Sequence, residues 1–192
     1  RAARDAHLAR RKTPLTGVSE FPNIAEPAPA EAPAPVAGGL PRRRYAQAYE
    51  ALRDRSDAYL AATGKRPTVV LATIGGMRDY SARVGFAGGA LAPGGIDVVE
   101  APADDPAALA AGCDAGAAVA CLCSSDPLYS ERAVDAAAAV RAAGARSVYL
   151  AGRPARDREA GLREAGIDGF MFVGSDILAM LGDVLTESGV SA

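Results

Sequence analysis

The stretch that decides the fold is TVVLATIGGMRDYSARVGFAGGALAPGGIDVV, from Thr68 to Val99. It predicts a buried strand (68–73), a glycine turn, an amphipathic helix (80–91) and a second strand (97–100). A strand, a helix and a strand in this order open a parallel α/β sheet, in which ligands usually lie beyond the carboxyl ends of the strands. The turn contains no histidine, and the single histidine of the chain is His7. Chemistry that needs an imidazole from this domain is therefore excluded.

Predicted strands and helices continue to alternate to the end of the chain. Apolar runs without alternation, typical of strands covered by helices on both faces, occur in predicted strands at 68–73, 117–123, 147–150 and 169–173, and a further strand is predicted at 97–100. Patterns of helical period, several ending at a glycine, predict helices at 80–91, 106–111, 128–143, 155–165 and 176–188. Five such units predict a flavodoxin-like, doubly wound parallel sheet of five strands in the order 2-1-3-4-5.

The residues before this α/β unit predict a different organisation. Residues 1–12 have the charge-rich pattern of a helix end, and the chain starts at Arg1 rather than Met, so we expect the C-terminal piece of a longer protein. Alternating proline and alanine within 25–41 favour extended backbone, as in a linker or strap. A helix over 42–62 follows, with apolar residues at helical spacing: Tyr45, Tyr49, Leu52 and Leu60.

Composition excludes several classes of protein. The net charge is −2, from 21 basic and 23 acidic residues, so no strong field attracts nucleic acid or an anionic membrane. Cys113, Cys121 and Cys123 form neither a CxxC pair nor an even disulfide set, which indicates a reducing compartment. There is no signal peptide and no apolar run of membrane-spanning length. We therefore expect a cytoplasmic protein.

The candidate site consists of residues that follow the strands. They are Gly75, Gly76, Asp79, Ser124, Leu128, Gly152 and Gly174. Small side chains and backbone amides there suit a cradle for a bulky ligand, but tight turns require the same residue types, and both interpretations stay open. Asp79 and Asp126 are more typical of helix starts than of an acid–base pair. Cys121 and Cys123 fall on a predicted buried strand, and no nucleophile–base set can be assembled, so we predict neither catalytic residues nor a metal site.

A resemblance adds to this reading. KTPLTGVSEFPNI, from Lys12 to Ile24, resembles the segment that joins the barrel to the C-terminal domain in methylmalonyl-CoA mutases, where a TGV(S/N)EFP(N) run is characteristic. The strand–helix series behind a proline-rich linker is similar to the cobalamin-binding domain of that family. The resemblance covers most of the chain. It implies three parts: the end of a barrel domain with its connector (1–24), a Pro/Ala-rich linker plus helix (25–66), and a cobalamin-binding-like domain (67–192).

The sequence departs from the motifs of the family's catalytic subunits. Those subunits carry a D-x-H-x-x-G turn after the first strand, and its histidine coordinates cobalt. Here Asp79 aligns with the aspartate, but Ser81 stands where the histidine is expected. Ser124 and Leu128 match the family's serine–leucine motif only loosely, and Gly152 stands alone where the family has two glycines. The candidate residues are therefore vestigial, because a hydroxyl is a poorer cobalt ligand than an imidazole and Arg153 narrows the place for the nucleotide tail.

In its departure from these motifs the chain resembles the smaller, non-catalytic subunit of the family's heterodimers. The resemblance implies an isomerase complex whose large subunit binds adenosylcobalamin and interconverts (R)-methylmalonyl-CoA and succinyl-CoA by a radical rearrangement. This chain would support that subunit, with the Pro/Ala strap and the helix over 42–62 as candidate contact surfaces. Two alternatives stay open: a domain that holds cobalamin without a histidine ligand, and a free-standing flavodoxin-like module for another ligand.

Overall fold

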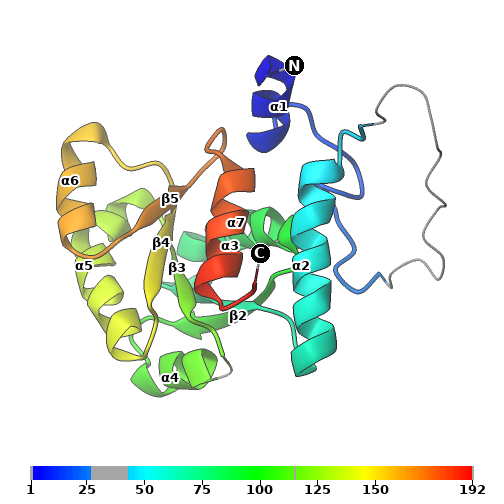
Figure 1. Ribbon diagram of the computed structural model, residues 1–192. Helices are drawn as coiled ribbons and strands as arrows, with labels where there is room; N and C mark the ends of the chain where they lie inside the picture. Colours follow the sequence, from blue (N-terminus) through cyan, green and yellow to red (C-terminus); the bar gives the residue numbers. More distant parts are fainter. Residues whose placement is uncertain (1, 27–42, 115, 192) are drawn as a thin grey trace, which may run out of the picture.

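Five parallel strands form the central sheet of the structure, a computed structural model that describes residues 2–26, 43–114 and 116–191 (Figure 1). The strands are β1 (Thr68–Thr73), β2 (Asp97–Pro102), β3 (Val119–Cys123), β4 (Ser147–Ala151) and β5 (Gly169–Met171). Their order is β2-β1-β3-β4-β5, which confirms the predicted flavodoxin-like topology. In register, Val69 of β1 lies between Val98 and Val119. The strand order reverses at β1 and β3, so their carboxyl ends form the switch point of the sheet.

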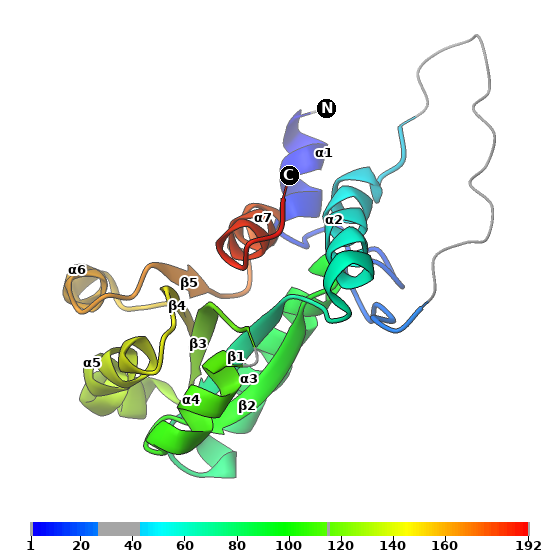
Figure 2. The ribbon, with the colours of Figure 1, turned by 60° about the horizontal axis from the view of Figure 1, so that its bottom comes forward.

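Helices cover both faces of the sheet. They are α3 (Met77–Leu91), α4 (Pro106–Asp114), α5 (Asp126–Ala142), α6 (Arg156–Glu164) and α7 (Ile177–Glu187), with a short 3-10 helix η1 (Ala92–Gly94) after α3. One buried cluster joins α3 and α7 to the sheet, and a second joins α4, α5 and α6 to its other face. Figure 2 shows α5 and α7 on opposite sides of the strands.

Alternate strand residues supply the two clusters. Leu71 and Cys121 face the α3–α7 side, whereas Ala72 and Leu122 face the α4–α6 side, and all four are at most 1% exposed. Since both faces are buried, residues 69–72 of β1 and all of β3 are apolar without alternation, which is the pattern that the sequence shows.

Two helix starts differ from their predicted positions by three residues or more. Helix α3 begins at Met77 instead of residue 80, because Gly76 and Asp79 cap an additional turn. Helix α2 (Gln47–Thr63) begins five residues after its predicted start at 42. Tyr45 therefore lies outside the apolar face that we assigned to it. It is 56% exposed, and the guanidinium of Arg4 lies over its ring.

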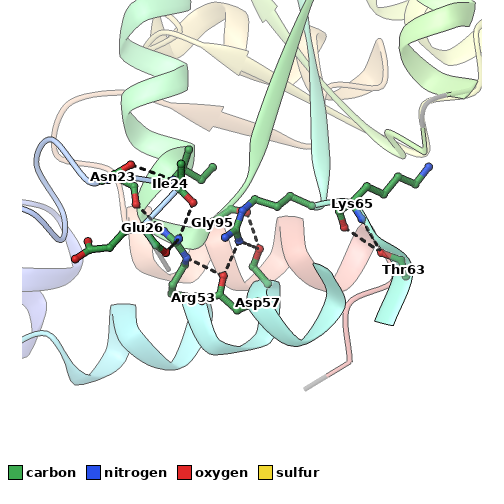
Figure 3. Close-up of polar contacts among 11 residues, drawn as sticks. Asn23, Ile24, Glu26, Arg53, Asp57, Thr63, Lys65 and Gly95 are labelled. Atoms are coloured by element: carbon green, nitrogen blue, oxygen red, sulfur yellow. Dashed lines mark hydrogen bonds and ion pairs between the residues drawn. The ribbon is translucent and has the colours of Figure 1, made fainter. Parts of the chain in front are cut away.

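The N-terminal segments pack against the α/β unit. The Tyr49 hydroxyl of α2 donates to the Leu8 carbonyl at the end of α1 (Ala2–Ala9), 3.0 Å away. Leu52 of α2 shares the core cluster that contains α3 and α7, and Arg53 bonds the carbonyls of the connector (Figure 3). The division into parts 1–24, 25–66 and 67–192 stays a prediction. The Pro/Ala-rich stretch 27–42 lies outside the described residues, so its assignment as a linker also stays a prediction.

No helix in the described ranges combines the length and the apolar character needed to cross a membrane.

Candidate functional site

The turn after β1 is built around two glycines and one carboxylate. Gly75 adopts a φ of 87°, in the left-handed region that favours glycine, and Gly76 precedes the first turn of α3. The Asp79 carboxylate accepts a hydrogen bond from the Gly76 amide at 2.9 Å. This contact confirms the predicted role of Asp79 as a helix-capping residue, so its carboxylate is engaged within the fold.

The turn after β3 closes onto the turn after β1. Ser124 is fully buried, and its hydroxyl donates to the Ile74 carbonyl at 2.8 Å. Leu128 lies directly against Gly75, because a Cβ at that glycine would be 2.5 Å from the Leu128 Cδ1 atom. Side chains of this chain therefore occupy the space at the switch point.

Tyr129 joins the ends of β3 and β4. Its hydroxyl accepts from the Ser124 amide at 2.8 Å and lies 3.0 Å from the Leu122 carbonyl and 2.9 Å from the Ala151 carbonyl. Burial raises the pKa of this phenol, with the neighbouring cysteines as a lesser cause. The hydroxyl therefore stays protonated near neutral pH and links the ends of the two strands.

Arg83 of α3 is the residue that sequence reasoning missed. Its Nη2 atom donates to Asp126 at 2.8 Å, and a Cβ at Gly152 would lie 3.2 Å from its Nη1 atom. Asp126 starts α5, as expected, but its side chain pairs with Arg83 and does not cap the helix. The i, i+4 spacing of Asp79 and Arg83 places both on one face of α3. This spacing could have indicated from the sequence that Arg83 lies near the candidate site.

That Arg153 narrows the place for a nucleotide tail stays a prediction. Its guanidinium lies over the ring of Phe172, with 4.9 Å between the Cζ atom and the ring centroid. The guanidinium in contact with Gly152 is that of Arg83.

The structure brings most, but not all, of the predicted residues together. Gly75, Gly76, Asp79, Ser124 and Leu128 meet at the ends of β1 and β3, and Gly152 joins them through Arg83. Ser81 is exposed on α3, beyond the capped first turn. Gly174 lies in the loop before α7, and a Cβ there would meet no other atom within 4 Å.

The cysteines show no sign of reactive chemistry. Cys121 and Cys123 are 1% and 0% exposed, which confirms their predicted burial, and both are free thiols. A hydrogen bond with Cys121, together with burial, raises the pKa of Cys123 and disfavours its thiolate. Across the described part of the chain, no three His, Cys, Asp or Glu side chains gather in a group that could hold a metal ion.

Fold and site together define a flavodoxin-like α/β domain whose strand-end polar groups bond to one another. No family model matches the chain. It is 46% identical over 99% of its length to the methylmalonyl-CoA mutase small subunit of Streptomyces virginiae. It is 39% identical over 98% to the probable small subunit of Mycobacterium bovis, and 37% identical over 99% to the small subunit of Propionibacterium freudenreichii subsp. shermanii.

The chain spans about 30% of the length of these curated relatives. Over nearly its whole length it is therefore homologous to a segment of methylmalonyl-CoA mutase small subunits.

Proposed function

We propose that this chain supports the large subunit of a methylmalonyl-CoA mutase without holding cobalamin itself. In this proposal the large subunit binds adenosylcobalamin and interconverts methylmalonyl-CoA and succinyl-CoA, and the two subunits form a heterodimer. The observation that carries the proposal is the identity of 37–46%, over nearly the whole chain, to proteins named as the small subunit of this isomerase.

The residues at the strand ends do not fit a corrinoid. Leu128 fills the space beside Gly75, and Arg83 approaches Gly152 from the neighbouring helix. Asp79 is used as a helix cap, and the Ser81 hydroxyl is exposed on α3. A bulky cofactor would have to displace a packed leucine and break the Arg83–Asp126 ion pair, and it would find no imidazole in return. We therefore assign the cofactor to the large subunit.

The same contacts suit a supporting role. Ser124 and Tyr129 form hydrogen bonds that link the carboxyl ends of β1, β3 and β4 to one another. These bonds keep together the strand ends that would have to separate to admit a ligand. Closed strand ends make the domain a rigid body with a fixed surface, which is what a partner subunit needs for packing.

Titration with adenosylcobalamin and hydroxocobalamin tests the assignment. The purified protein is mixed with each corrinoid, passed through a desalting column and examined by visible absorbance. We expect no corrinoid to remain with the protein. Tight retention with a base-off spectrum would contradict the proposal and support a domain that holds cobalamin without a histidine ligand.

Co-purification tests the partnership. A tagged large subunit is expressed with this chain, and the stoichiometry of the eluted complex is measured. We expect both chains in equal amounts, whereas elution of the large subunit alone would contradict a supporting role for this segment.

A further inference from the structure

We propose a nucleotide-binding site at the carboxyl ends of β4 and β5, on the side of the sheet that carries α5 and α6. Two adjoining cavities form it. The larger, of about 610 Å³, is called the arginine basin and is lined by Arg153, Arg156, Arg163, Phe170 and Phe172 among others. The smaller, of about 270 Å³, is called the apolar slot and includes Tyr129, Leu150, Gly152, Arg158 and Leu162. Nucleotide phosphates would occupy the basin and the base would occupy the slot.

The cations of the basin are held by aromatic rings. The Cζ atom of Arg153 lies 4.9 Å from the centroid of Phe172, and that of Arg163 lies 5.1 Å from the centroid of Phe170. A ring orients a guanidinium through its face and leaves the N–H donors at the edge free for an anion, as at Arg153. The donors of Arg163 are already bonded to the Glu159 carboxylate and to the Asp168 carbonyl. Guanidinium forks of this kind match the oxygens of phosphate groups.

The charges around the basin favour an anion. Arg163 pairs with Glu159 at 3.0 Å, so this arginine is partly neutralised. Arg153 and Arg156, by contrast, have no carboxylate within ion-pair distance in the part of the chain that the structure describes. Many arginines elsewhere in the molecule are paired, as Arg83 is with Asp126 and Arg141 is with Asp168. The two unpaired guanidiniums carry the proposed phosphate contact.

The slot differs from the basin in polarity. Leu150, Tyr129 and Leu162 are 2%, 8% and 9% exposed, so their side chains present a mostly buried apolar surface. A Cβ at Gly152 would lie 3.3 Å from the Leu150 Cδ2 atom, and the glycine keeps this wall free of a side chain. A planar heterocycle is the kind of group that enters such a narrow apolar space.

The two cavities share one wall, formed by Arg153, Pro154 and Ala155. One ligand can therefore reach both, provided that it has a planar apolar end and an anionic end. An inorganic phosphate would use the basin alone, and an apolar compound would use the slot alone. A nucleoside diphosphate has an end of each kind. This site does not rest on the proposed function, because its ligand would bind over the ends of β4 and β5, although the slot shares Tyr129 and Gly152 with the candidate site described above.

Calorimetric titration of the purified protein with ADP, adenosine and pyrophosphate tests the site. We expect ADP to bind at least about tenfold more tightly than either fragment, because only ADP fills both cavities. The double variant Arg153→Gln/Arg156→Gln should weaken ADP binding about tenfold or more and weaken adenosine binding much less, because only Arg153 also lines the slot. The matched control Arg78→Gln/Arg132→Gln removes two exposed charges outside both cavities and should leave the Kd for ADP unchanged.

A second variant tests the shared wall without a change of charge. Ala155→Phe places a ring between the basin and the slot, so ADP binding should weaken while thermal unfolding stays as in the wild type. Three results would overturn the proposal: no heat of binding at about 1 mM ADP, equal affinity for ADP and one of its fragments, or an unchanged Kd in both the arginine variant and Ala155→Phe.

Discussion

At the scale of single residues, the turn after β1 depends on which of its two glycines is replaced. Gly75 has a φ of 87°, and a Cβ there would lie 2.5 Å from Leu128, whereas Gly76 has a φ of −88° and ordinary contacts. We expect Gly75→Ala to lower the free energy of unfolding by about 2–4 kcal/mol, through backbone strain and overpacking. Gly76→Ala is the matched control and should change it by no more than about 0.5 kcal/mol.

Urea denaturation of both variants measures the difference. Adding Leu128→Ala to Gly75→Ala should relieve the overpacking but not the strain, so the double variant separates the two causes. Equal stability of the two glycine variants would show that Leu128 does not rest on Gly75.

Residue roles were predictable where they depend on neighbours in sequence. Asp79 lies three residues after Gly76, so its capping contact could be predicted from the spacing. The contact of Arg83 with Gly152 joins residues far apart in the chain, and no local pattern encodes it. The role of Tyr129 could not be predicted from the sequence, because the three backbone partners of its hydroxyl come from two different strands and a turn.

At the scale of elements, strand order and the number of strands followed from the sequence, but some element ends did not. Apolar runs located most of the strands, since burial on both faces leaves a strong pattern in β1, β3 and β4. The edge strand β2 is mostly exposed and lacks this pattern. The predicted strand over 169–173 ends at Met171 instead, because Phe172 bonds to Ser175 within a turn. Such an end depends on a turn that hydropathy does not reveal.

Helices α1 and α2 are joined by a buried phenol, and this contact predicts a dependence on alkaline pH. Tyr49 is 1% exposed and donates to the Leu8 carbonyl, and burial raises its pKa from 10.0 to about 12. Between these two values the unfolded chain releases the proton while the folded protein keeps it. The free energy of unfolding therefore falls as the pH rises from 10 to 12 and is unaffected by this group below that range.

Tyr49→Phe should remove part of this alkaline slope. At neutral pH the variant should be less stable by about 1 kcal/mol, because the hydrogen bond to Leu8 is lost. Some slope should persist, since burial also raises the pKa of Tyr129 and Tyr149. Denaturation curves recorded at intervals through the alkaline range give the slope, and an identical slope in variant and wild type would contradict the assignment.

At the scale of the whole molecule, α2 holds the connector that precedes it and the C-terminal residues of the described chain. Arg53 donates to the Ile24 carbonyl at 2.7 Å and pairs with Asp57 at 3.0 Å (Figure 3). Arg55 donates to the carbonyls of Val190 and Ser191, at 3.1 and 3.0 Å. We expected the helix over 42–62 to contact a partner. Its buried face and these two arginines instead contact other parts of the same chain.

Hydrogen exchange of the two arginine variants tests this arrangement, and each variant is the control for the other. Amides in both segments are hydrogen-bonded: the Ser19 amide donates to Leu15 in the connector, and the Val190 amide donates to Leu185 near the C-terminus. Arg53→Ala should speed exchange within residues 13–26 about fivefold or more and leave 186–191 unchanged, because only the connector loses its tie. Arg55→Ala should do the reverse. If each variant instead accelerates exchange in both segments, α2 detaches as one unit. The connector and the C-terminal residues would then be stabilised together by the apolar face of α2 and not separately by its arginines.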